Sequence, residues 1–135
     1  MDYPTQIPFA EMLDFELLRF EDGEADIACN VRSAMYNSMG SAHGGVSMSL
    51  LDIAMVHAAR SPKQGESTPY PVCSTIEMKT TFLRPGKGRL LAKGTVVHRT
   101  GAMIFCEASV FDEAGDLTAR GSGTFKYISK SAEIN

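Results

Sequence analysis

The stretch from Gly44 to Ala59 constrains the fold of this chain more than any other. It consists mainly of small and apolar residues, and only Asp52 and His57 in it can ionise. The apolar residues cover every side of a helical wheel, which predicts a helix that is buried all round. The stretch is too short and too interrupted to span a membrane, which requires about 20 apolar residues.

We expect this helix to begin near His43, with Ser41 as its N-cap, and to end at Arg60, because a serine and a proline follow. The glycines Gly44 and Gly45 would then present bare backbone N–H groups at the positive end of the helix dipole. Such a position is suited to stabilising a developing oxyanion.

Asp52 requires an explanation, because a carboxylate inside an apolar helix is costly unless it has a partner or a task. Gly44 and Asp52 are eight residues apart, which places them about 12 Å apart along one helix. Reacting groups must lie about 3 Å from a common centre. If both residues act on one substrate, they come from two antiparallel copies of the helix, which predicts a dimer with shared sites. For His57, the ordinary interpretation is a packed histidine.

The remaining chain alternates in hydrophobicity as β-strands do. Strands are expected at 14–20, 24–31, 72–83, 89–98, 102–111 and 116–127. A short amphipathic segment at 7–13 predicts one or two helical turns within an N-terminal extension at about 1–12. Residues 61–71 are an exposed connection, and the tail at about 128–135 is polar and expected to fray. In the third strand, Ile76, Met78, Thr80 and Phe82 are expected to share one face.

Two strands, one long helix and four more strands predict an α+β fold in which a curved antiparallel sheet wraps around one central helix. We expect residues 1–135 to form a single domain. Such a sheet would cover only part of the helix and would leave its edge strands open. Pairing two copies edge to edge would cover both the exposed part of the helix and the open strand edges. This is a second reason to expect a dimer.

The composition excludes several classes of protein. The net charge is −3 without a basic run, so nucleic acid is not an expected partner. Cys29, Cys73 and Cys106 are odd in number and widely spaced, which indicates reduced core thiols rather than disulfides, and no His or Cys spacing indicates a metal site. The N-terminus lacks a basic region followed by an apolar one, so we expect no signal peptide and a cytoplasmic location.

Several spaced motifs together resemble the hotdog-fold acyl-CoA thioesterases, specifically the PaaI-like branch of the 4-hydroxybenzoyl-CoA thioesterase superfamily. An asparagine lies six residues before the histidine of a His-Gly-Gly motif, and an acid lies nine residues after it. The resemblance covers the chain from the first strand onward. Its residues are Asn37, Gly40, His43-Gly44-Gly45, Leu50-Leu51-Asp52, Thr75 to Lys79, Phe82-Leu83-Arg84-Pro85, Arg99-Thr100-Gly101, and the turn Asp112 to Gly115 with Ala119.

The resemblance implies a role for each motif residue in thioester hydrolysis. The Gly44 N–H would bind the thioester carbonyl, and Asn37 would be a second polar contact near the carbonyl or the attacking water. Asp52 would activate water as a general base or attack the carbonyl directly to give an anhydride. Thr75 would help to hold the water, with the adjacent Ser74 as the alternative.

The remaining implied roles concern support and binding. His43 and Gly45 would order the loop rather than transfer protons. Arg84 and Arg99 would meet the phosphates of coenzyme A, although a solvated surface is the alternative for both. The resemblance implies a CoA thioester as substrate, no cofactor or metal, and a dimer or tetramer whose sites are shared between subunits. Aryl-acetyl, benzoyl, short and medium acyl groups all remain possible.

Two other functions are compatible with the same fold. A hotdog hydratase or dehydratase would need a histidine base beside an acid, and no such pairing surrounds His43. A non-catalytic acyl-CoA-binding module would have no need for the carboxylate of Asp52. Release of free thiol from acyl-CoA separates these possibilities.

Overall fold

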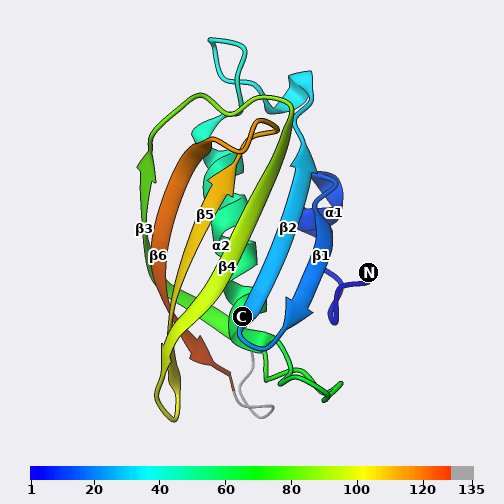
Figure 1. Cartoon of the computed structure of the whole chain (residues 1–135), viewed down its shortest axis with the longest axis vertical. Coiled ribbons are helices and arrows are strands. Elements are labelled where there is room, and N and C mark those ends of the chain that lie inside the picture. Colours follow the sequence, from blue (N-terminus) through cyan, green and yellow to red (C-terminus); the bar gives the residue numbers. More distant parts are fainter. Residues whose placement is uncertain (129–135) are drawn as a thin grey trace.

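The computed structural model describes residues 1–128, which form one curved antiparallel sheet around one long helix (Figure 1). The six strands lie in the order β1-β2-β4-β5-β6-β3, so β1 and β3 are the two edges. This is the α+β hotdog architecture that the sequence predicts. The predicted polar tail lies, beyond Ile128, outside the described residues.

The elements agree with the expected segments to within two residues at each end, and only the short helix η1 falls in a predicted loop. Their bounds are α1 (Pro8–Met12), β1 (Glu16–Glu21), β2 (Glu24–Asn30), η1 (Ser33–Met35), α2 (Gly44–Arg60), β3 (Cys73–Phe82), β4 (Arg89–Arg99), β5 (Met103–Phe111) and β6 (Leu117–Tyr127).

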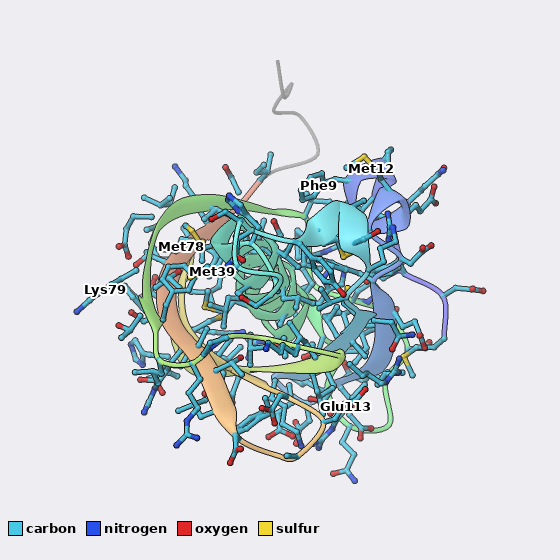
Figure 2. The ribbon with its side chains drawn as sticks, turned by 90° about the horizontal axis from the view of Figure 1, so that it is seen from above. Phe9, Met12, Met39, Met78, Lys79 and Glu113 are labelled. Atoms are coloured by element: carbon cyan, nitrogen blue, oxygen red, sulfur yellow. The ribbon has the colours of Figure 1, made fainter. Side chains whose placement is uncertain are left out.

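Helix α2 runs inside the curve of the sheet, which leaves one side of the helix open. Viewed from above, the open side lies between β3 and the segment α1 that carries Phe9 and Met12 (Figure 2). The expectation of a helix buried all round is therefore wrong for one stripe, which is exposed or half-buried in the single chain. The stripe consists of Gly45, Met48, Ser49, Asp52 and Val56, whereas the rest of the helix from Val46 onward is buried.

Two details of the strands differ from the expected alternation. The register of β3 shifts between Thr75 and Glu77, so Ile76 turns outward and is 52% exposed instead of sharing a buried face with Met78. In β6, Thr118 falls where the register with β5 shifts. It is buried, and its hydroxyl donates a hydrogen bond to the Val110 carbonyl at 3.1 Å.

The sheet approaches α2 most closely at Gly94 in β4. A Cβ atom at this position would lie 2.5 Å from the carbonyl oxygen of Ala54, which is helix backbone and cannot move aside. We expect Gly94→Ala to lower the free energy of unfolding by about 1–3 kcal/mol or more through overpacking. Urea unfolding measures the effect. Gly101→Ala is the matched control, because a Cβ there meets nothing within 4 Å; equal midpoints for the two variants would contradict the prediction.

The three cysteines are free; Cys29 and Cys106 are buried, and Cys73 is partly exposed on the β3 edge. Within residues 1–128, no helix has the length and hydropathy needed to cross a bilayer. No cluster of metal-ligating side chains occurs in the same range.

Candidate active site

The first turn of α2 begins at His43, which is the N-cap in place of the expected Ser41. The His43 Nδ1 accepts a hydrogen bond from the Gly45 N–H at 2.9 Å, so the expectation of a bare N–H at Gly45 is wrong. The neighbouring Gly44 N–H has no recorded acceptor among residues 1–128. One unpaired donor therefore remains at the positive end of the helix, where an oxyanion would be stabilised.

The loop that leads into α2 is closed by Asn37. Its Oδ1 accepts hydrogen bonds from the N–H groups of Met39 at 2.9 Å and Ser41 at 3.2 Å, and its Nδ2 donates to the Ser41 hydroxyl at 3.1 Å. These bonds give Asn37 a role in shaping the loop. A direct contact between Asn37 and substrate stays a prediction.

Asp52 lies on the open stripe of α2 and is joined to β3 by one hydrogen bond. The Thr75 hydroxyl donates to Asp52 Oδ1 at 2.8 Å. Thr75 occupies the position at which the register of β3 shifts, and such irregularities redirect side chains. Ser74 precedes Thr75, so strand alternation turns it toward the opposite face. The structure thus brings Thr75, rather than Ser74, to the carboxylate.

The surroundings of Asp52 change its acidity. Partial burial raises the pKa of the Asp52 carboxyl, and the hydrogen bond from Thr75 opposes this effect by lowering the pKa. A carboxylate that has lost part of its hydration is a stronger base than one in water. The site therefore combines a more basic carboxylate with a hydroxyl that can also hold a water.

The oxyanion donor and the carboxylate do not meet within one chain. Gly44 lies at the start of α2 against the ring of Phe82, two of whose carbons would lie 3.3 Å from an added Cβ. Asp52 lies eight residues further along the same uninterrupted helix, about 12 Å away. Within one chain, the two candidate groups are therefore too far apart to act on the same carbonyl.

The two candidate substrate-binding arginines lie at opposite ends of α2. Arg84 follows β3 at the Gly44 end, and its guanidinium is largely exposed, 3.9 Å from Asp116. Arg99 lies at the carboxyl end, where it donates to the Ala59 carbonyl and the Tyr127 hydroxyl, each at 3.2 Å. Arg99 thus also stabilises the helix terminus, and contact of either arginine with phosphate stays a prediction.

His57 is a packed histidine, as expected. It is buried beside the rings of Tyr3 and Phe20, with Nδ1 2.7 Å from the Ile53 carbonyl oxygen. Burial lowers the pKa of His57 to about 4, so the imidazole is neutral at physiological pH. Its side chain lies on the flank of α2 away from the open stripe.

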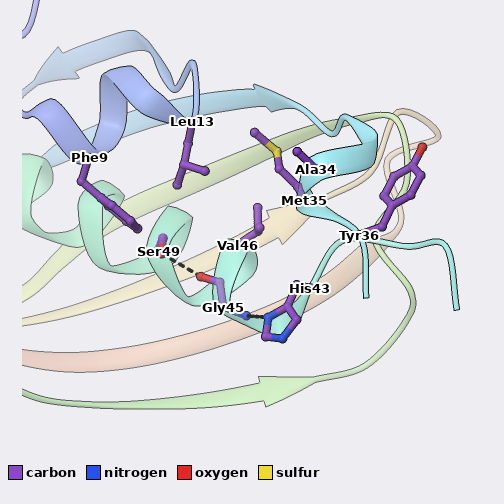
Figure 3. Close-up of a pocket in the computed structure, with 9 residues that line it drawn as sticks. All are labelled: Phe9, Leu13, Ala34, Met35, Tyr36, His43, Gly45, Val46 and Ser49. Carbon is purple, nitrogen blue, oxygen red and sulfur yellow. Dashed lines mark hydrogen bonds between the residues drawn. The ribbon is translucent and has the colours of Figure 1, made fainter. Parts of the chain in front are cut away.

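A pocket of about 370 Å³ opens beside the first turn of α2 (Figure 3). Phe9 and Leu13 form one wall, and His43, Gly45 and Val46 form the wall opposite. The sequence prediction placed Phe9 and Leu13 in a short amphipathic segment at 7–13 but did not place that segment beside α2. The four-residue spacing of Phe9 and Leu13 was the available signal, because it puts both side chains on one face of a helical turn.

Comparison with known proteins identifies the class to which this fold belongs. The model of the thioesterase superfamily matches residues 39–119, which is more than half of the chain and includes Gly44, Asp52 and Thr75. The chain belongs to the thioesterase superfamily.

Individual relatives agree with this family. A protein of Halobacterium salinarum that is named as an esterase is 32% identical over 64% of this chain; the match spans 60% of that protein. The structure of the Escherichia coli PaaI protein from the phenylacetic acid degradation operon has a TM-score of 0.80 and 25% identity, covering 90% of this chain and 84% of that one. A variant of phenylacetic acid degradation protein PaaI from Thermus thermophilus has a TM-score of 0.78 and 27% identity, covering 90% and 100%.

Proposed function

We propose that this protein hydrolyses acyl-CoA thioesters at sites shared between two copies of the chain. The Gly44 N–H of one copy binds the thioester carbonyl, and Asp52 of the second copy activates water or attacks the carbonyl. The observation that carries the proposal is that α2 has two suitable groups. One is an N–H without an acceptor at the start of the helix, and the other is a carboxylate on its open stripe that is hydrogen-bonded to Thr75.

The helix itself indicates how two copies would pack. If two α2 helices cross antiparallel so that Gly44 of one meets Asp52 of the other, the two-fold axis passes near the residue midway between them, Met48. Met48 is 39% exposed at the centre of the open stripe. Gly45 and Ser49 flank it, and their small side chains permit close approach of two helices.

The adjacent edge strand supports the same arrangement. Strand β3 pairs with β6 on one side only, and it carries exposed apolar side chains along and beside its length. These are Val72, Ile76, Phe82 and Leu83, each between 40% and 53% exposed. A long open edge with apolar side chains is a surface that folded proteins normally cover. A second copy would cover this edge together with the open stripe.

The chemistry follows from these groups. Water attacks the thioester carbonyl as the Asp52 carboxylate takes its proton, or the carboxylate attacks and water then cleaves the resulting anhydride. The Gly44 N–H stabilises the negative charge that develops on the carbonyl oxygen. Collapse of the intermediate breaks the carbon–sulfur bond and releases coenzyme A as a thiolate, which leaves without strong acid assistance.

The same geometry disfavours hydratase or dehydratase chemistry. A histidine base would need a free ring nitrogen beside an acid, but the His43 Nδ1 already accepts the Gly45 N–H. This hydrogen bond supports a structural role for His43, in which it orders the first turn of the helix and does not act as a base.

Release of free thiol tests the proposal directly. The purified chain should liberate coenzyme A from at least one of acetyl-, hexanoyl-, phenylacetyl- and benzoyl-CoA, detected with a thiol-reactive chromophore. Binding of these thioesters without thiol release would instead identify a non-catalytic binding module.

Self-association is tested at the proposed axis. In Met48→Glu, two carboxylates would face each other across the two-fold axis, where their repulsion opposes association. We expect the variant to shift to monomer and to lose activity about 10-fold or more. Light scattering after size exclusion, with a parallel thiol assay, provides the measurement. Met39→Glu is the control, because Met39 is exposed in the loop before α2; a Met48→Glu chain that stays associated and active would refute the arrangement.

A further inference from the structure

The pocket beside the first turn of α2 takes no part in breaking the thioester bond. Its position and its lining residues indicate a different role. Its walls come from three separate parts of the chain (Figure 3). These are Phe9 on α1 with Leu13 just after it, Ala34 and Met35 on η1, and the start of α2 from its N-cap His43. It therefore exists only because the N-terminal segment folds back over α2.

The pocket begins where the proposed carbonyl site ends. His43 and Gly45 line the pocket, and Gly44 is the residue between them in the chain, so the proposed oxyanion donor is adjacent to the pocket. The opposite side of Gly44 is filled by the Phe82 ring. A thioester carbonyl bound by Gly44 would thus have the pocket next to it on the α1 side. On the other side, the exposed Arg84 lies beyond Phe82.

The only polar side chains in the lining are those of Tyr36, His43 and Ser49, and the other six residues are apolar or glycine. The Ser49 hydroxyl donates to the Gly45 carbonyl at 2.7 Å, and the His43 Nδ1 accepts the Gly45 N–H at 2.9 Å. No Asp, Glu, Lys or Arg lines the pocket. Transfer of an ionised carboxylate into such surroundings is costly, whereas an apolar group loses nothing in hydrogen bonding.

The wall formed by α1 is fixed in place. Ala10 is fully buried under it, and the Phe15 N–H donates to the Ala10 carbonyl at 2.9 Å. Arg32 donates to the Met12 carbonyl at 2.7 Å. The wall is thus part of the folded structure, and the pocket is largely preformed, as ligand sites usually are.

We propose that this pocket holds the acyl group of the substrate and selects uncharged, apolar acyl groups, with Phe9 and Ala34 setting the permitted size. This inference rests on the proposed function. An apolar cavity of about 150 Å³ is sufficient for benzene, so a pocket of about 370 Å³ has room for an aromatic ring with a short linker or for a chain of about six carbons. Acyl groups with a terminal carboxylate, such as succinyl, are excluded by desolvation.

Two substitutions that act in opposite directions test the assignment. Ala34→Phe places a ring into the pocket from an exposed position on η1, and Phe9→Ala removes part of a wall. Met12→Ala is the matched control, because Met12 is on the same short helix, is 60% exposed and does not line the pocket. The probes are the thioethers S-hexyl-CoA and S-ethyl-CoA, which cannot be hydrolysed, with binding measured by calorimetry.

We expect Ala34→Phe to raise the Kd for S-hexyl-CoA about 10-fold or more, the scale on which apolar pockets discriminate size, and to change the Kd for S-ethyl-CoA less than about twofold. We expect Phe9→Ala to shift the relative kcat/KM from hexanoyl- toward longer acyl-CoAs. Succinyl-CoA should be turned over at least about 10-fold more slowly than hexanoyl-CoA.

The outcomes separate this inference from the proposed function. Selective loss of S-hexyl-CoA binding without any thiol release would support the pocket and refute hydrolysis. Thiol release that Ala34→Phe lowers equally for acetyl- and hexanoyl-CoA would support hydrolysis and overturn the pocket assignment. Failure of the unmodified chain to distinguish S-hexyl-CoA from S-ethyl-CoA would also overturn it.

Discussion

Replacing Asp52 with Asn is expected to lower kcat for thioester hydrolysis by about 10²-fold to 10⁴-fold, the usual contribution of a general base. The amide keeps the size of the side chain and can still accept the hydrogen bond from Thr75, but it cannot take a proton or form an anhydride. KM should change little, because the carboxylate acts on water or on the carbonyl rather than on the CoA portion. Thiol-release kinetics measure both parameters, and unchanged turnover would remove Asp52 from the mechanism.

Loss of folding would not explain this result, because the same change is expected to stabilise the chain at neutral pH. Burial raises the pKa of Asp52 in the folded state, so the fold binds this proton more tightly than the unfolded chain does. The stabilisation from the proton is present at low pH and is lost as pH rises through the raised pKa. At pH 7 the buried charge is therefore destabilising, and Asp52→Asn should not lower Tm.

The pH dependence of activity provides an independent control on the same residue. Activity needs the ionised carboxylate, so kcat should fall toward acid at a pH above the usual range for an aspartate. Removal of the Thr75 hydroxyl in Thr75→Val deletes the bond that lowers this pKa. The acidic limb of the profile should then move to higher pH.

Mixing two inactive variants is expected to restore activity. Gly44→Pro removes the proposed oxyanion N–H while leaving the helix intact, because Gly44 is the first residue of α2 and proline is favoured there. His43 precedes it with a ψ of 141°, which is compatible with a following proline. When Gly44→Pro and Asp52→Asn chains exchange subunits, each mixed dimer regains one complete site. An equal mixture should recover about a quarter of the unmodified activity, since about half of the dimers are mixed.

The control for this experiment is Gly44→Ala, which adds the same Cβ beside Phe82 but keeps the N–H. It should retain far more activity than Gly44→Pro, which is expected to lose about 10²-fold. If the mixture of the two inactive variants stays inactive after verified subunit exchange, each site lies within one chain and the shared-site arrangement is wrong.

Much of this architecture is predictable because its signals are local. The apolar run from Gly44 to Ala59 and the period-two strands fix the elements, and the helical rise alone separates Gly44 from Asp52. The hydrogen bond between Thr75 and Asp52 joins two residues that the family motif had already selected.

Two features differ from the sequence prediction or are missing from it. The cap of α2 is His43 instead of the expected Ser41, whose hydroxyl accepts a hydrogen bond from the Asn37 amide. The place of Phe9 opposite the first turn of α2 results from the way β1 and β2 carry α1 back over the helix. The first arrangement depends on the geometry of the loop before α2. The second depends on the tertiary fold, because the spacing of Phe9 and Leu13 indicates a shared face but not what that face contacts.

The register shift in β3 has a consequence for the behaviour of isolated chains. A regular, exposed edge strand can template addition of any extended segment, and repeated addition leads to fibrils. In β3 the residue Ile76 falls outside the regular pairing with β6, and an irregularity of this kind bends the strand and makes its open edge a poorer template. If two copies associate as proposed, the irregularity next to Thr75 would also limit the templated addition of other strands to β3 before the edge is covered.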